Sequence, residues 1–178
     1  IDEMGAAQVS LTDLHRVLCG LLDEDVPIRD LVRIIEAVTE QARQAKEPEP
    51  MLEAARRALG PSITASCADN GVLPIISLDA RLERTLVEGV RPGDGGTTLG
   101  VDPDLAEALI REIGLLAKQT EERGRQAVLV CAARLRPSLR RLLAPALPRL
   151  GVLSINELGP QLKLERIGVV NVAAAEVV

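Results

Sequence analysis

Few residues in this sequence could carry out nucleophilic catalysis. A serine or cysteine nucleophile needs a neighbouring base, and His15 is the only histidine in the chain. His15 stands among Leu11, Leu14 and Leu18, which lie at helical spacing and indicate a structural position at the edge of an apolar helix face. We therefore expect no catalytic residue and no enzymatic activity.

Phosphate and metal chemistry are not indicated either. The glycine-rich stretch 93–100 lacks the G-K-[ST] ending of a phosphate-binding loop and does not lead directly from a strand into a helix. It is predicted to be a flexible loop. The cysteines Cys19, Cys67 and Cys131 are far apart and form no C-x-x-C pair. The sequence predicts no cofactor, no metal site and no disulfide framework, and this cysteine usage is typical of a reducing compartment.

The chain is acidic overall, but one stretch is strongly basic. Its 178 residues carry a formal net charge of -5 and include no Phe, Tyr or Trp. From Arg123 to Asn156 there are only basic charges. Nucleic-acid binding is disfavoured because aromatic stacking residues are absent and the chain is acidic. The basic stretch therefore indicates either a solvated helix face or an outer surface, around Arg136, Arg140 and Arg141, for a protein partner or a neighbouring copy.

Residues 1–70 are predicted to be all-helical. Ser10 followed by Asp13 is a capping box ahead of a helix over 11–22. Pro27 is typical of a first helical turn, and Leu31, Ile34, Ile35 and Val38 would line the inward face of that second helix. Two more helices are expected, from residues 51 to 59 and from 63 to 67.

Residues 71–178 are predicted to form a small α/β layer domain, because strand and helix patterns alternate there. The expected strands cover 72–78, 127–131, 151–155 and 162–170, and the expected helices cover 80–90, 103–124 and a segment starting at Pro137. Pro74 would place its strand at an edge of the sheet. The fold class is thus mixed α+β and α/β, with an all-helical N-terminal subdomain before a sheet-and-helix subdomain.

The pair Arg29 and Asp30 is more easily explained by helix electrostatics than by catalysis. Asp30 in a first helical turn interacts favourably with the positive end of the helix dipole. Arg29 is unfavourable there by the same rule. An acidic neighbour must therefore favour it, either Asp25 or a carboxylate of another chain.

Several phrases, in order along the chain, resemble the large export-gate protein of flagellar and type III secretion systems (the FlhA type). The helical phrases VLCGLL (17–22), VPIRDL (26–31) and IIEA (34–37) are similar to its third cytoplasmic subdomain. The phrases LPIISLD (73–79), AVLV (127–130), LRPSLRRLL (135–143) and VLSINEL (152–158) are similar to its last subdomain. Relatives commonly carry an aromatic residue where this chain has Ser138 and Ile155, and Gly60-Pro61 interrupts a helix that they continue.

The resemblance implies a non-enzymatic scaffold at the cytoplasmic face of the bacterial inner membrane. Family members form a homo-nonameric ring, mainly through the third subdomain, and their last subdomain contacts the stalk protein of the export ATPase and the gatekeeper protein. This implies self-association through Arg29, Asp30 and Arg33, and partner binding around the arginines near residue 140.

No run of about 18 apolar residues is present. Any membrane attachment would therefore lie in a transmembrane part that this sequence, which begins without Met, is expected to lack. Two alternatives stay open: a stand-alone adaptor that remains monomeric, and a small α/β hydrolase or phosphate-binding enzyme.

Overall fold

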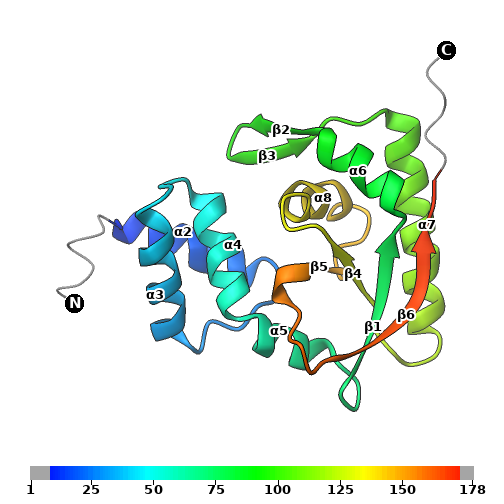
Figure 1. Ribbon diagram of the computed structural model, residues 1–178, viewed down its shortest axis with the longest axis horizontal. Helices are drawn as coiled ribbons and strands as arrows, with labels where there is room; N and C mark the ends of the chain where they lie inside the picture. The colour runs from blue at the N-terminus through cyan, green and yellow to red at the C-terminus, as the bar shows by residue number, and fades with distance from the viewer. Residues whose placement is uncertain (1–8, 173–178) are drawn as a thin grey trace.

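The computed structural model describes residues 9–172. Short helices come first and a parallel sheet with flanking helices follows (Figure 1). The first helices are α2 (Leu11–Leu22), α3 (Leu31–Ala42), α4 (Pro48–Ala58) and α5 (Gly60–Cys67). The fold is mixed α and β, as predicted. We call residues 9–70 the helical half and 71–172 the sheet half, while a division into two subdomains at residue 70 stays a prediction.

The starts of α2 and α3 show where local signals hold and where they fail. The capping box of α2 is confirmed, since Ser10 Oγ accepts a hydrogen bond from the Asp13 backbone N–H at 3.0 Å. The prediction that Pro27 lies in the first turn of the next helix is wrong. The helix begins at Leu31, and Asp30 is its N-cap, accepting from the Arg33 N–H at 3.2 Å. Asp30 therefore acts by capping, which is a common use of aspartate at this position.

A four-stranded parallel sheet forms the centre of the sheet half. Its strands are β1 (Val72–Leu78), β4 (Val128–Cys131), β5 (Gly151–Ser154) and β6 (Lys163–Val170), in the order β5-β4-β1-β6. The prediction that Pro74 places its strand at an edge is wrong, because β1 pairs on both sides. Pro74 is tolerated because it precedes the three residues in register with β4, which are Ile75 to Ser77.

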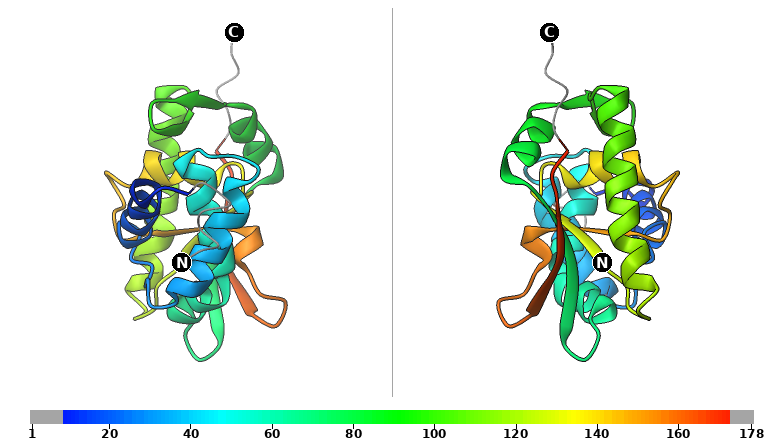
Figure 2. Two further views of the ribbon diagram at one scale, coloured as in Figure 1. Left: turned by 90° about the vertical axis from the view of Figure 1, so that its left-hand side faces the viewer. Right: turned by 90° about the vertical axis from the view of Figure 1, so that its right-hand side faces the viewer.

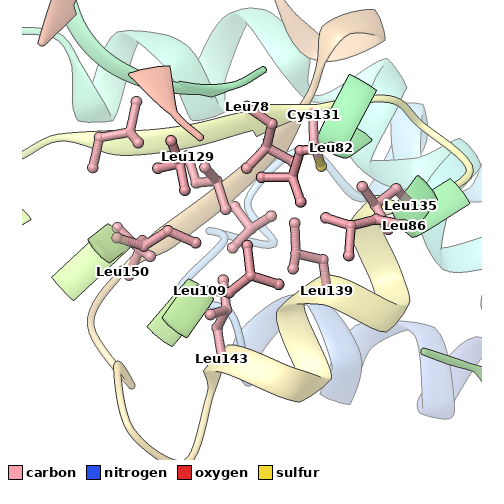
Figure 3. Packing of buried hydrophobic residues seen from close by; sticks show 14 of the residues in the cluster. Leu78, Leu82, Leu86, Leu109, Leu129, Cys131, Leu135, Leu139, Leu143 and Leu150 are labelled. Carbon is pink, nitrogen blue, oxygen red and sulfur yellow. The ribbon is translucent and has the colours of Figure 1, made fainter. Parts of the chain in front are cut away.

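The sheet separates two hydrophobic cores, which explains why its central strands are apolar at successive positions. Leu73 and Ile75 of β1 pack with the helical half, while Ile76 and Leu78 face the opposite core. That second core is built on α6 (Ala80–Glu88), α7 (Pro103–Glu121) and α8 (Arg136–Leu143). Figure 3 shows leucines from these helices and from the sheet converging there. The side views show α7 running beside β1 and β6 (Figure 2).

The glycine-rich stretch is not the flexible loop that its composition predicted. It forms an antiparallel hairpin of β2 (Val90–Gly93) and β3 (Gly96–Leu99), closed by Asp94 and Gly95. Gly95 has a φ of +79°, a conformation that glycine adopts without strain. An aspartate-glycine pair is a strong hairpin signal. The hairpin packs against α8, as Figure 1 also shows.

Candidate interaction sites

The residues predicted for self-association lie together on the surface at the start of α3. Residues 29–33 are all exposed, and we call them the entry patch. Asp30 caps the helix and lies 3.5 Å from Arg33 Nε in an exposed ion pair. Arg29 forms no hydrogen bond or ion pair within residues 9–172, so the expected pairing with Asp25 is absent there. The other expectation for Arg29, a carboxylate of another chain, stays a prediction.

Two apolar side chains complete the entry patch. Leu31 is 46% exposed and Val32 is 69% exposed. Leu31 was predicted to join the inward stripe of its helix, and that prediction is wrong. Its stripe partners Ile34 and Val38 are buried, but Leu31 lies one turn too early to reach the core. Exposed leucine and valine beside two arginines form a surface of mixed character, as interfaces between protein chains often do.

Arg136 does not lie on an outer surface, and the prediction that it does is wrong. Its side chain is 1% exposed. Nε donates to Glu53 Oε2 at 2.7 Å, and the two Nη atoms donate to the two carboxylate oxygens of Glu24 at 2.7 and 3.1 Å. Glu24 and Glu53 belong to the helical half, so these ion pairs enclose the arginine between the two halves. It therefore cannot contact a partner in this arrangement.

The other two arginines of α8 differ in their exposure. Arg140 is 14% exposed, lies 3.9 Å from Glu24 and donates to the Pro148 carbonyl at 3.2 Å. Arg141 is 44% exposed and pairs with Glu49. The Glu49 carboxylate also accepts from the Thr97 hydroxyl at 2.7 Å, which links the hairpin to α4. Of the three predicted partner-binding residues, only Arg141 keeps substantial exposure.

A second buried arginine was missed in the sequence. Arg56 of α4 is 2% exposed and pairs with Glu24 at 3.2 Å and with Glu157 at 2.8 Å. Glu157 belongs to the short 3-10 helix η1 (Ile155–Glu157). A signal was available, because Arg56 lies at helical spacing between Leu52 and the buried Leu59. We call the residues that meet here the charge cluster, and they are Glu24, Glu53, Arg56, Arg136, Arg140 and Glu157.

Within the charge cluster, burial and ion pairing act in opposite directions on the pKa of Glu24, Glu53 and Arg136. Burial disfavours the ionised carboxylate of Glu24, but the charges of Arg136 and Arg56 outweigh this effect and lower its pKa. For Glu53, burial prevails over the hydrogen bond from Arg136 and raises the pKa. Burial also opposes the charge of Arg136, yet its contacts with Glu53 and Glu24 raise the pKa of that guanidinium. The cluster has three acids and three arginines, so it is electrically balanced.

The structure brings His15 and Cys19 together on α2 and leaves Cys67 and Cys131 apart from them. His15 is exposed on α2, with Nε2 at 3.6 Å from Cys19 Sγ. Cys131 is buried in the core on the side of the sheet opposite the helical half, and burial raises the pKa of its thiol. Among residues 9–172 there is no group of three or more His, Cys, Asp and Glu side chains able to hold a metal ion.

Comparison with known proteins identifies the family. Residues 1–163 match the model of the FHIPEP family. The chain belongs to the FHIPEP family. The flagellar biosynthesis protein FlhA of Bacillus subtilis is 33% identical over 173 residues, which are 97% of this chain and 26% of that protein. The chain therefore spans about a quarter of the length of this FHIPEP relative.

Solved structures share the fold. The nonameric SctV-C of EPEC superposes with a TM-score of 0.82 at 25% identity, covering 95% of this chain and 51% of that one. The Chlamydia pneumoniae CdsV protein, in its complex with CdsO, gives a TM-score of 0.78 at 22% identity, covering 96% of this chain and 50% of that one. None of the helices within residues 9–172 has the length and hydrophobicity needed to span a bilayer.

Proposed function

We propose that this chain is a non-enzymatic scaffold of a flagellar or type III export gate and that it joins an oligomeric ring through the entry patch. The observation that carries this proposal is the exposure of Leu31 and Val32 beside Arg29, a cation with no partner within the described residues. A carboxylate from an adjacent copy would pair with Arg29, and the two apolar side chains would be buried in the contact. The nonameric assembly of the similar SctV-C supports a ring of nine copies.

Reversing the charge of Arg29 and Arg33 to glutamate should weaken self-association at least about tenfold. The melting temperature should change little, because the Arg33–Asp30 ion pair is exposed and glutamate is favourable near a helix N-terminus. Sedimentation velocity over a range of concentrations measures the association.

Arg43 supplies the matched control for that experiment. It lies just past the other end of α3 and also forms an exposed ion pair, with Glu40 at 2.7 Å. Arg43→Glu should leave self-association unchanged. A wild-type chain that stays monomeric throughout would favour the stand-alone adaptor instead.

The proposed scaffold also docks partners on its sheet half and lies at the cytoplasmic face of the bacterial inner membrane. The stalk and gatekeeper proteins are the partners that the family resemblance implies. Arg141 is the one predicted residue whose exposure supports such a contact. An acidic partner would compete with Glu49 for this guanidinium. Arg141→Glu should weaken binding of the stalk protein in titrations at low salt and have less effect at high salt. If the variant bound the stalk protein as tightly as the wild type at both salt concentrations, this site would be excluded.

A further inference from the structure

Glu24 connects the charge cluster to the entry patch. It lies in the segment 23–30 between α2 and α3, five positions before Arg29. Its carboxylate is 13% exposed and is shared by arginines of two helices, with Arg136 on both oxygens and Arg56 at 3.2 Å. A bidentate arginine contact fixes the orientation of a carboxylate as well as its position. The segment that leads to the entry patch is therefore fastened to α8 by a side chain.

The first part of this segment is held by backbone hydrogen bonds, and the second part is not. The N–H groups of Asp23, Glu24 and Asp25 donate to carbonyls in the last turns of α2. The Val26 N–H donates to the Leu21 carbonyl at 2.9 Å, and the Val26 side chain is buried. After Val26, no backbone N–H before Arg33 donates a hydrogen bond within the described residues, and the N–H of Ile34 donates to Asp30 at 3.1 Å. Residues 28–30, which donate no backbone hydrogen bond to any described residue, open at low free-energy cost unless side chains hold them, and Ile28 is only partly buried against the core. The contact between Glu24 and Arg136 is thus the main polar restraint on the entry patch from the sheet half.

We propose that Glu24 is a positioning residue that couples α8 to the entry patch, so that a change at α8 alters self-association. This inference rests on the proposed function, in which the entry patch is the ring contact. A cleft of about 400 Å³ borders the cluster, and Glu24, Arg136, Arg140 and Arg141 are among its lining residues. A partner bound to α8 at this cleft would displace Glu24 and, through segment 23–30, change the position of the entry patch. The helix α8 belongs to the sheet half, whereas the entry patch belongs to the helical half.

Hydrogen exchange on the whole chain tests the coupling directly. In Glu24→Gln, the amides of Val26, Arg33 and Ile34 should exchange about tenfold faster or more, and this increase should exceed that of amides in β4, which report global opening. Arg136→Lys, which keeps the charge and loses the bidentate contact, should produce a smaller change at the same three amides. Equal acceleration in β4 and in the three reporter amides would overturn the proposal, because Glu24 would then be a general stabilising residue.

Glu49→Gln is the matched control. It removes a second acid that joins α4 to α8, but Glu49 contacts Arg141 and Thr97 and no residue of segment 23–30. It should leave the three reporter amides unchanged, and their acceleration would show that any loss of charge between these helices has the same effect.

Sedimentation of the same variants separates this inference from the proposed function. Glu24→Gln should weaken self-association although the entry patch is intact. If reversal of Arg29 and Arg33 leaves association unchanged, the proposed function fails, while the exchange measurements still decide the coupling. If that reversal weakens association and Glu24→Gln changes neither exchange nor association, the coupling is wrong and the ring contact stands.

Discussion

Replacing Arg136 by methionine should lower the free energy of unfolding by about 3–5 kcal/mol. Methionine keeps much of the length of the side chain but removes the guanidinium. Glu24 and Glu53, which are 13% and 23% exposed, would then lose the cation that they share. Glu24 would keep its contact with Arg56, whereas Glu53 would be left without an ion-pair partner among the described residues. A buried charge without a partner costs more than the intact pair contributes, so the expected loss is large. Denaturation by urea, followed by far-ultraviolet circular dichroism, measures the change.

Two further variants make this result specific. Arg141→Met removes an arginine of the same helix that is 44% exposed, and it should cost no more than about 1 kcal/mol. Adding Glu53→Gln to Arg136→Met should recover part of the loss, because the carboxylate that lacks a partner is then gone. A loss for Arg136→Met as small as that for Arg141→Met would contradict the burial of the charge cluster.

The elements that could be predicted are those whose signals are local. The helix from Leu11 to Leu22 follows from a capping box and leucines at helical spacing, and both act within one or two turns. Asp102 before Pro103 marks the start of α7 in the same way, since an N-cap and a first-turn proline need no distant partner. For these segments the sequence was sufficient because no tertiary contact opposes the local preference.

The candidate sites could be predicted only in part, since burial depends on what the fold brings to a surface. Arg29, Asp30 and Arg33 are exposed together, but Leu31, which completes the entry patch, was predicted to point inward. That these residues form a contact between copies stays a prediction. The α8 arginines were predicted to lie on an outer face because the sequence indicates only that the leucine side of the helix is buried. It does not indicate that Arg136 on the opposite side meets Glu24 of the helical half, 112 positions away. Likewise, Pro74 is tolerated in a central strand because β4 pairs only with the residues that follow it, from Ile75 to Ser77.

Gly60 is a second place where a distant contact determines the residue, and Gly60→Ala should lower the free energy of unfolding by about 1–3 kcal/mol. A Cβ at this position would lie 2.5 Å from the backbone oxygen of Glu157 and 3.0 Å from its Cα. Backbone atoms cannot turn aside as a flexible side chain can, so α5 and η1 would have to separate. Because Glu157 pairs with Arg56, the separation would also disturb the charge cluster. Gly60 therefore reflects close packing as well as the break between α4 and α5.

Gly159 provides the comparison for this prediction. It lies two residues after Glu157, and a Cβ there would meet no atom within 4 Å. Gly159→Ala should therefore change the unfolding free energy by no more than about 0.5 kcal/mol. Urea denaturation of both variants gives the difference. An equal effect of the two substitutions would mean that α5 and η1 do not approach closely, and that alanine at residue 60 costs only what the local backbone imposes.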